Sequence, residues 1–286
     1  MFFRDLMQTI VHRILRVPYS LYVHEFQSPK KPQATFVFIH GIGASAHAWD
    51  EVVATMPKDV RLIGIDLLGF GKSPKPTWAV YNAKTQARSV AVTLLRLRLT
   101  QQLILVGHSL GALVSVEVAR RYPLAVQELV LCSPPFYAPQ RSEHKGLPSP
   151  DDMLRRLYGF AKRHPDQLLR WSPMAVKLGL ANRAFSITED TVTSYIGALE
   201  ASIINQNSLH TVAQLKRSIT IFYGALDPVV VAKNITGLAR DCPHITTRRL
   251  VAGHEVTGPY AKAVARHLAQ IATSSPRRYP TGAKRG

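Results

Sequence analysis

The feature that most constrains the fold of this chain is a regular alternation of two kinds of segment. Short apolar runs alternate with longer amphipathic stretches, as in a parallel sheet covered by helices. The apolar runs are rich in β-branched and aliphatic residues, which suits strands buried on both faces. Strands are predicted at residues 35–39, 60–65, 103–106, 129–132, 219–223 and 245–251. Helices are predicted at residues 46–56, 84–99, 110–122, 229–240 and 259–272.

The alternation stops between residues 136 and 210, where proline and polar residues are frequent and strand patterns disappear. Asp151 marks the start of one predicted helix, and Thr188 stands where an N-cap precedes two acidic residues. The sequence therefore predicts a helical lid over residues 136–210. This lid is inserted into a sheet domain that consists of residues 18–135 and 211–272.

The two ends of the chain differ from the rest. In residues 1–17, apolar side chains recur at about every fourth position, which predicts an amphipathic helix with arginines on its other side. We expect this helix to pack on the domain's own surface; the alternatives are peripheral contact with anionic lipid and contact in a dimer. Residues 273–286 are polar, basic and proline-containing, and we expect them to be disordered. The oligomeric state is left open.

Charge and composition exclude several classes of protein. The hydrophobic content of 46% excludes a mostly disordered chain, and no apolar run approaches the roughly 20 residues of a bilayer-spanning helix. The net charge is +18, but the basic excess is spread along the chain without a nucleic-acid-reading motif, so no nucleic acid partner is expected. Two cysteines, Cys132 and Cys242, make no disulfide framework. The N-terminus lacks the continuous apolar core of a signal peptide, so we expect a cytoplasmic protein.

The strongest indication of chemistry is the run Gly107-His108-Ser109-Leu110-Gly111, between a predicted strand and a predicted helix. In this context a G-x-S-x-G pattern forms a tight turn that raises the serine above the sheet in a strained conformation. The glycines let the strand and helix backbones approach each other. The helix N-terminus offers free N–H groups beside the serine. The alternative is an ordinary turn of glycine and serine.

This motif and four further elements, in the same order, resemble the α/β-hydrolase family in the form that carries a helical cap. The four elements are His40-Gly41-Ile42-Gly43, Asp66-Leu67-Leu68-Gly69-Phe70-Gly71-Lys72-Ser73, Asp227 and His254, and each follows a predicted strand. The resemblance covers residues 18–272. It implies an α/β fold with a mostly parallel, doubly wound sheet and an inserted helical lid, and such sheets bind ligands at the carboxyl ends of their strands.

The resemblance implies a catalytic triad of Ser109, Asp227 and His254. A serine hydroxyl is a poor nucleophile near neutral pH, so a base must take its proton. Of the eleven histidines, His254 lies on a glycine-preceded loop after the last predicted strand. Asp227 is expected to orient the imidazole, and the family's other location for the acid, after residues 129–132, contains no carboxylate. Asp66 is the competitor, but its glycine-rich turn favours a structural, backbone-capping role.

The family places two backbone N–H donors of an oxyanion hole at Ile42 and Leu110, with Gly43 as an alternative second donor. No metal or cofactor is required. Apolar side chains near these motifs or in the lid are candidates for substrate binding: Trp49, Phe136, Tyr137, Trp171, Met174 and Phe185. Each could instead hold the lid together. A largely apolar pocket favours a small-molecule ester with an apolar acyl or aryl group.

The predicted function is therefore hydrolysis of carboxylic esters through an acyl-enzyme intermediate. One alternative is a ligand receptor on a hydrolase fold with slow turnover. Another is a hydrolase of thioester or C–C bonds; relatives that cleave C–C bonds usually carry tryptophan after the catalytic histidine, whereas Glu255 follows His254 here. A third is an acyl hydrolase that residues 1–17 and the basic charge recruit to a membrane.

Overall fold

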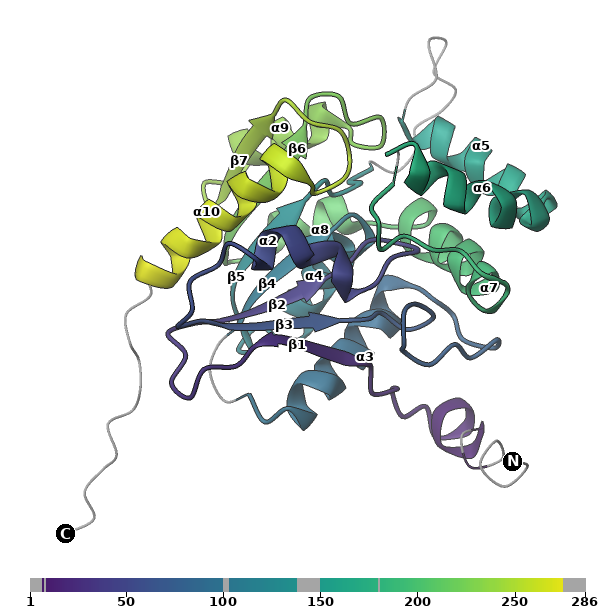
Figure 1. Cartoon of the computed structure of the whole chain (residues 1–286), viewed down its shortest axis with the longest axis horizontal. Helices are drawn as coiled ribbons and strands as arrows, with labels where there is room; N and C mark the ends of the chain where they lie inside the picture. The colour runs from purple at the N-terminus through teal and green to yellow at the C-terminus, as the bar shows by residue number, and fades with distance from the viewer. Residues whose placement is uncertain (1–6, 8, 100–102, 138–149, 180, 275–286) are drawn as a thin grey trace.

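The computed structural model describes residues 7, 9–99, 103–137, 150–179 and 181–274. Seven strands form one sheet in the order β1-β3-β2-β4-β5-β6-β7. Neighbouring strands are parallel except β1, which runs antiparallel to β3. The strands are β1 (Val23–Gln27), β2 (Thr35–Ile39), β3 (Arg61–Ile65), β4 (Leu103–His108), β5 (Val126–Cys132), β6 (Ser218–Gly224) and β7 (Ile245–Leu250). The predicted mostly parallel, doubly wound sheet is confirmed (Figure 1).

Strand β1 is the one strand of this sheet that the sequence does not predict. It pairs with β3 at the sheet edge, where Val23 lies opposite Ile65. All five of its residues are at least partly exposed. An edge strand needs no continuous apolar run, because one side of it is solvated, and this strand therefore lacks the apolar pattern of the strands in the middle of the sheet.

Side chains along each strand alternate between two apolar cores, one on each face of the sheet. In β2, Val37 and Ile39 belong to one core, whereas Phe36 and Phe38 belong to the other. The helices that contribute to the first core include α3 (Ala83–Arg96), α4 (Leu110–Arg121), α8 (Ser208–Gln214) and α9 (Ala232–Asp241). Those of the second core are η2 (Ala46–Trp49), α2 (Asp50–Val53) and α10 (Gly258–Ser274), of which α2 and α10 lie in front of the sheet in Figure 1.

Between β5 and β6 the chain leaves the sheet and forms further helices, which we term the insertion. They are α5 (Pro150–Arg163), α6 (Pro165–Lys177), α7 (Glu189–Ala198) and η3 (Leu199–Ile204), and α5, α6 and α7 stand to one side of the sheet in Figure 1. The predicted N-cap is confirmed, because α7 begins directly after Thr188. The backbone N–H of Thr188 also donates to Thr191 Oγ1 at 2.9 Å. A lid function of the insertion stays a prediction.

The described part of the N-terminal segment buries none of its apolar side chains fully, although Ile10 and Val11 are half-buried. It forms one short helical turn, η1 (Thr9–Ile14), in which no residue is buried. Ile14 and Leu15 are exposed by 66% and 64%. The turn instead contacts the domain through His12, whose ring stacks on Tyr19 with centroids 3.6 Å apart.

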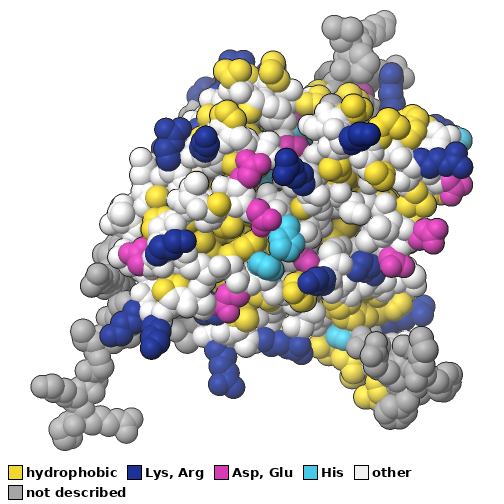
Figure 2. All heavy atoms as spheres, viewed as in Figure 1, with side chains coloured by type: hydrophobic (Ala, Val, Ile, Leu, Met, Phe, Trp, Pro, Cys, Tyr) yellow, Lys and Arg dark blue, Asp and Glu magenta, His cyan; other side chains and the backbone are white. Residues whose placement is uncertain are grey.

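Parts of both predicted end segments lie outside the described residues, namely residues 1–6, 8 and 275–286. At the C-terminal end, α10 continues to Ser274, which is two residues beyond the predicted end of the helix at 272. Within the described ranges, every helix is too short or too polar to cross a lipid bilayer. Lysine and arginine side chains are scattered over the face that Figure 2 shows, in agreement with the even spread of charge along the sequence.

Candidate active site

The serine of the predicted turn connects β4 to α4 in a strained conformation. Ser109 has φ = 50° and ψ = −115°, in the left-handed half of backbone space that residues other than glycine rarely occupy. Its N–H donates to the carbonyl of Cys132 at 2.9 Å, and its own carbonyl accepts from the N–H of Ala112 at 3.0 Å. These bonds stabilise the turn that was predicted for a nucleophile at the end of a strand.

The two glycines of the motif are required by close backbone contacts. A Cβ atom on Gly107 would overlap the carbonyl of Gly111. A Cβ atom on Gly111 would overlap the carbonyl of Ile39, at the end of β2. The predicted reason for small residues, which is the close approach of strand and helix backbones, is confirmed.

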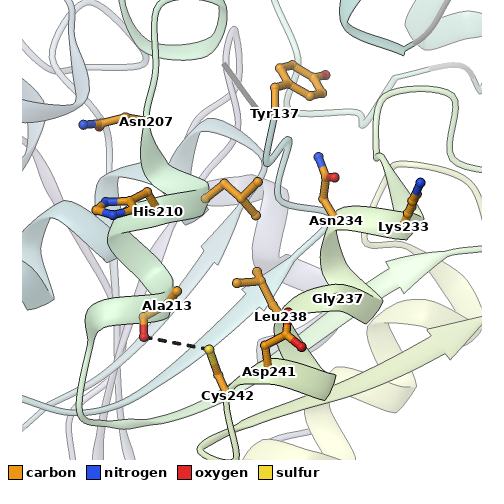
Figure 3. A pocket seen from close by; sticks show the side chains of 11 residues that line it. Tyr137, Asn207, His210, Ala213, Lys233, Asn234, Gly237, Leu238, Asp241 and Cys242 are labelled. Atoms are coloured by element: carbon orange, nitrogen blue, oxygen red, sulfur yellow. Dashed lines mark hydrogen bonds between the residues drawn. The ribbon is translucent and has the colours of Figure 1, made fainter. Parts of the chain in front are cut away.

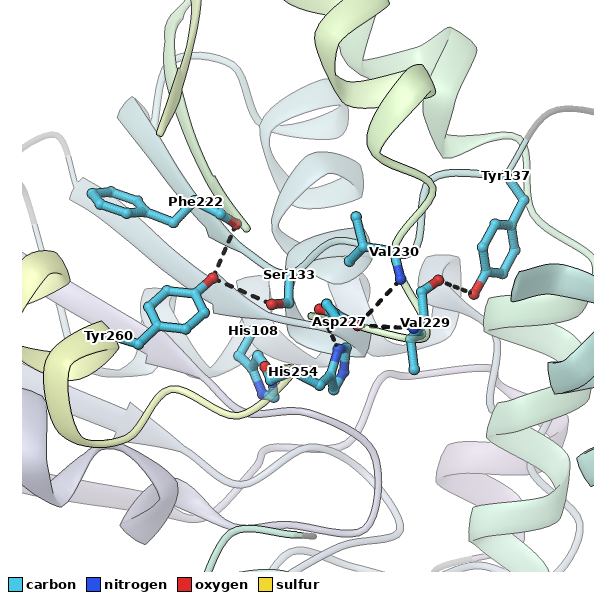
Figure 4. Close-up of polar contacts among 9 residues, drawn as sticks. All are labelled: His108, Ser133, Tyr137, Phe222, Asp227, Val229, Val230, His254 and Tyr260. Carbon is cyan, nitrogen blue, oxygen red and sulfur yellow. Dashed lines mark hydrogen bonds and ion pairs between the residues drawn. The ribbon is translucent and has the colours of Figure 1, made fainter. Parts of the chain in front are cut away.

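Asp227 and His254 meet beside this turn (Figure 4). His254 Nδ1 lies 2.8 Å from Asp227 Oδ2, and the Asp227 side chain is fully buried. Asp227 Oδ1 accepts the backbone N–H groups of Val229 at 2.8 Å and Val230 at 3.2 Å. Burial by itself raises the pKa of Asp227, but the hydrogen bond and charge of His254, the Val229 N–H and the Ser133 hydroxyl lower it below its ordinary value. Asp227 is therefore ionised at neutral pH and fixes the imidazole.

Backbone contacts hold the acid loop against the histidine loop. The N–H of Ala225 donates to the carbonyl of Leu250 at 2.7 Å. At the closest approach, a Cβ atom on Gly224 would overlap the carbonyls of Ala252 and Gly253. The two loops can lie this close only because position 224 has no side chain.

We expect Gly224→Ala to lower the free energy of unfolding by about 1–3 kcal/mol, because the new methyl group forces two packed backbones apart. Gly237→Ala, in the middle of α9, is the matched control, since a Cβ atom there meets nothing within 4 Å. The control should raise the free energy of unfolding by about 0.5–1 kcal/mol, because alanine favours helix. Urea denaturation measures both changes, and a Gly224→Ala variant as stable as the control would contradict this account of the loops.

His108 links the nucleophile's turn to His254. Its Nε2–H donates to the carbonyl of His254 at 3.0 Å, and the two ring centroids are 5.0 Å apart. Burial lowers the pKa of His108 to about 3, so this ring is neutral. From the sequence we expect only local packing or hydrogen bonding for His108, and its hydrogen bond to the backbone of His254 was missed. No sequence pattern indicates this link, because 146 positions separate the two residues.

The link between the serine and the imidazole is indirect. Among the contacts of the described residues, no hydrogen bond joins Ser109 Oγ to His254 Nε2, whereas the Asp227–His254 bond is formed. Hydrogen bonds between nucleophile and base are often long in ligand-free enzymes and tighten with substrate. The structure therefore brings together the predicted acid and the predicted base, and places Ser109 on the turn that contacts His254 through His108.

The loop that was predicted to form one side of the oxyanion hole borders Ser109. A Cβ atom on Gly41 would lie 3.4 Å from Ser109 Cβ. His40 fixes this loop, because its Nε2 accepts the N–H of Leu67 at 2.9 Å and its Nδ1–H donates to the carbonyl of Gly41 at 2.7 Å. Burial lowers the pKa of His40, in keeping with a neutral ring.

The two predicted oxyanion donors belong to segments that flank the nucleophile. Ile42 lies in the loop that His40 fixes. Leu110 is the first residue of α4, so its N–H has no acceptor within the helix. That Ile42 and Leu110 bind an oxyanion stays a prediction.

Asp66, the competing acid, has the structural role that the sequence favours. Its Oδ1 accepts the N–H of Ala46 at 2.7 Å, and its Oδ2 accepts the N–H of Lys72 at 2.8 Å. Both carboxylate oxygens therefore cap backbone groups. Asp66 holds the glycine-rich turn and is not the partner of His254.

The candidate substrate-binding residues are dispersed. Trp49 and Phe136 are fully buried in the two apolar cores, whereas Trp171 and Met174, on α6, are exposed by 56% and 53%. The Tyr137 hydroxyl donates to the carbonyl of Val229 at 2.8 Å. Its side chain also lines a cavity of about 420 Å³ between α8 and α9 (Figure 3), whose lining includes no residue of the predicted triad. Substrate binding by these residues stays a prediction.

The insertion touches the site at two loops. Phe185 packs against Gly43, where a Cβ atom would overlap the aromatic ring, and the N–H of Ser186 donates to the Gly43 carbonyl at 2.8 Å. Burial raises the pKa of Glu255, and the nearby backbone of Asn182 lowers it in part. The Gly43 loop and the His254 loop therefore both lie beside residues 182–186.

No cluster of three or more histidine, cysteine, aspartate or glutamate side chains that could hold a metal ion occurs within the described part of the chain. The polar groups around Ser109 instead pair with one another and with the backbone. The arrangement contains an acid, a base and a strained serine after the carboxyl ends of β6, β7 and β4, which suits nucleophilic catalysis.

Curated relatives match part of the chain. A probable lysophospholipase of Arabidopsis thaliana, BODYGUARD 1, is 31% identical over 169 residues, which cover 57% of this chain and 34% of that protein. An uncharacterized protein of Mycobacterium tuberculosis is 36% identical over 97 residues, which cover 34% of this chain and 28% of that protein. The chain thus spans about a third of the length of the curated relatives that it matches.

Solved structures are similar over nearly the whole chain. An esterase from Exiguobacterium antarcticum has a TM-score of 0.74 at 18% identity and covers 89% of this chain and 96% of its own. An enol-lactonase from Burkholderia xenovorans has a TM-score of 0.66 at 19% identity, with 88% and 96% covered. At such identities the likeness shows the fold alone. A family model described as the alpha/beta hydrolase fold matches residues 34–256, and the chain therefore belongs to the α/β-hydrolase fold family.

Proposed function

We propose that this protein is a serine hydrolase that cleaves carboxylic esters through an acyl-enzyme intermediate. The observation that carries the proposal is the 2.8 Å contact between His254 Nδ1 and the buried Asp227 carboxylate, beside the strained turn of Ser109. Acyl transfer needs a nucleophile, a base that takes its proton and an acid that orients the base, and the serine, histidine and aspartate of this site are groups of these three kinds.

In the first half of the reaction, Ser109 Oγ attacks the ester carbonyl carbon while His254 Nε2 takes the hydroxyl proton. The negative charge on the carbonyl oxygen is held by the N–H groups of Ile42 and Leu110. The C–O bond then breaks, and the proton on His254 goes to the leaving alcohol. Asp227 stays ionised and stabilises the imidazolium.

In the second half, water attacks the acyl carbon while His254 takes one of its protons. The bond from the acyl carbon to Ser109 Oγ breaks, the proton returns to the serine, and a carboxylic acid leaves. Each group is restored, so the cycle consumes one ester and one water.

We infer that the substrates are esters with an apolar acyl group. The name of a curated relative, a probable lysophospholipase, supports an ester substrate, and the aromatic ring of Phe185 beside the Gly43 loop supports an apolar acyl group. Ser109 is exposed by only 5%, so the substrate would enter when residues 182–186 of the insertion move away from the Gly43 loop. Phe185 would then contact the acyl group.

A panel of p-nitrophenyl esters with acyl chains of two to sixteen carbons tests the proposal. We expect saturable turnover whose kcat/KM depends on chain length, because an apolar site gains about 0.8 kcal/mol for each methylene group that it buries. Lack of turnover with every ester would contradict it and favour the alternative of a ligand receptor. Thioester substrates with the same acyl chains test the alternative of a thioester hydrolase, because their kcat/KM can be compared with that of the matching esters.

Membrane association is a second candidate property, and we propose it because several apolar side chains in the described part of the N-terminal segment are exposed. Ile14, Leu15 and Val17 are exposed beside two arginines, Arg13 and Arg16. Such a segment can insert apolar side chains into a lipid surface while its cations contact anionic headgroups. A chain that lacks residues 1–17 should sediment at least tenfold less with phosphatidylserine vesicles than the full chain. Equal sedimentation of the two chains would contradict membrane association through residues 1–17.

A further inference from the structure

The first two helices of the insertion present a set of large apolar side chains to solvent. We term this set the insertion stripe, and its six members are Met153, Leu157 and Phe160 on α5, and Trp171, Met174 and Leu178 on α6 or at its C-cap. Phe160 is half-buried, and the other five are exposed by between 40% and 65%. The rings of Phe160 and Trp171 stack with their centroids 5.7 Å apart, so the two halves of the stripe form one surface.

The stripe is not what holds the insertion on the domain. Within each helix its members are separated by three or four positions, which places them on one helical face. Other positions of the same helices supply the packing, because Leu154, Ala161 and Leu168 are buried in the first core. The alternative that Trp171 and Met174 hold the lid together is therefore not supported, and their exposure needs another explanation.

A row of cations borders the stripe on each helix. The cations are Arg156 and Arg163 on α5, and Arg170 and Lys177 on α6. Phe160 lies four positions after Arg156 and three before Arg163, and Met174 has the same spacing between the two cations of α6. All four cations are exposed, and among the described residues none of them forms an ion pair. Figure 2 shows yellow and dark blue side chains mixed over the region where Figure 1 labels α5 and α6.

The charge and the size of this surface indicate what covers it. A symmetric contact between two copies would place the four cations of each copy in the same interface, where they repel. A specific protein interface uses about 20–30 residues on each side, and the stripe with its cations is far smaller. An anionic lipid surface satisfies both observations, because apolar side chains enter the acyl boundary while cations contact the headgroups. Tryptophan, here Trp171, is enriched at that boundary.

We propose that the insertion stripe and its four cations dock the protein on an anionic lipid surface. The apolar side chains of α5 and α6 lie at the boundary between headgroups and acyl chains, and the cation rows contact the phosphate and carboxylate groups of the lipids. This surface is separate from residues 1–17. Vesicle binding needs no turnover, so this inference and the proposed function can fail independently.

Sedimentation of the full chain with phosphatidylserine vesicles tests the apolar part. We expect Trp171→Gln with Met174→Gln to lower the affinity for the vesicles at least tenfold, because two apolar side chains no longer leave water. Leu95→Gln with Leu124→Gln is the matched control, since these leucines are exposed by 74% and 83% outside the insertion. The control should bind as the natural chain does. Urea denaturation checks that both double variants fold.

The cations are tested by a second pair of variants. Arg170→Gln with Lys177→Gln should lower the affinity for phosphatidylserine vesicles about 10- to 30-fold and leave the weak binding to phosphatidylcholine vesicles unchanged. Lys262→Gln with Arg266→Gln removes the same charge from exposed positions of α10. This control should bind within about threefold of the natural chain, and high salt should remove the difference between the two variants.

Tryptophan fluorescence locates the contact. Trp49 is fully buried, whereas Trp78 and Trp171 are exposed by 37% and 56%. Phosphatidylserine vesicles should shift the emission of the natural chain to shorter wavelength, and Trp171→Phe should lose this shift while Trp78→Phe keeps it. The ring of Trp78 lies 6.0 Å from that of Tyr19, close to the N-terminal turn. A shift that is lost only in Trp78→Phe would therefore assign the lipid contact to the N-terminal segment and overturn the proposal.

Three further results would overturn the lipid-docking surface. The first is a natural chain that binds phosphatidylserine vesicles no better than phosphatidylcholine vesicles, which would favour an acidic protein as the partner. The second is equal vesicle binding by the natural chain and by Trp171→Gln with Met174→Gln. The third is a dimer in analytical ultracentrifugation that this double variant dissociates, because the stripe would then be covered by a second copy of the chain.

Discussion

Replacement of Ser109 by alanine should lower kcat/KM for ester hydrolysis by about 10⁵- to 10⁶-fold, the largest effect that we expect for any substitution in this chain. The substitution removes the atom that forms the acyl bond, and no second nucleophile can enter the strained turn between β4 and α4. Steady-state hydrolysis of the best ester measures the loss. Residual activity within tenfold of the natural chain would exclude Ser109 as the nucleophile.

Folding of the Ser109→Ala variant is the control for this result. Alanine keeps the backbone strain at φ = 50°, so the free energy of unfolding should change by less than about 1 kcal/mol. Ser109→Gly should be equally inactive but more stable than Ser109→Ala, because glycine tolerates this conformation. The pair of variants therefore separates loss of the hydroxyl from a change in stability.

Asp227→Asn should lower kcat by about 10⁴-fold, the size of the loss when the acid of a comparable triad is made neutral. The amide cannot stabilise the imidazolium, and it can favour the wrong tautomer of His254. Asp241→Asn is the matched control, since Asp241 is exposed and pairs only with the neighbouring Arg240 in the described contacts. In the Ser109→Ala background, Asp227→Asn should add almost nothing, because the triad acts as a unit.

The same substitution should change how stability depends on pH. The pKa of Asp227 is lower in the folded protein than its ordinary value, so the unfolded chain takes up its proton first. The resulting stabilisation is complete above the unfolded pKa of about 3.9 and is lost as the pH falls through the folded pKa. Urea denaturation between pH 3 and pH 6 should therefore show that the free energy of unfolding of the natural chain falls towards acid pH. This fall should be smaller in Asp227→Asn. Equal declines would contradict an ionised, stabilised Asp227.

The sequence was most informative where backbone geometry requires particular residues. Gly107 and Gly111 mark the turn at Ser109, because any side chain there would overlap a backbone carbonyl. The apolar runs of the five central strands follow from burial on both faces, whereas β1 and β7 lie at the two edges of the sheet and are partly exposed. Strand β1 has no apolar run and was not predicted. Asp227 and His254 were identified because each follows a strand, and the fold brings the ends of these strands together.

Contacts between side chains distant in the sequence could not be predicted in the same way. His108 contacts the backbone of His254, which is 146 positions further along the chain. Only the register of the parallel strands brings them together. The apolar composition of α6 was likewise ambiguous: Trp171 suits a pocket wall as well as an exposed face, and its position depends on how the insertion packs.

Covalent labelling of the native protein with a fluorophosphonate tests the central claim most directly, because this reagent phosphonylates only a serine hydroxyl that a neighbouring base activates. We expect one equivalent of label, found by peptide mass spectrometry on the hydroxyl at position 109. Labelling should vanish in Ser109→Ala and be at least 100-fold slower in Asp227→Asn. A natural chain that stays unlabelled, or a label that Ser109→Ala accepts at an undiminished rate, would show that acid, base and serine do not form a catalytic unit.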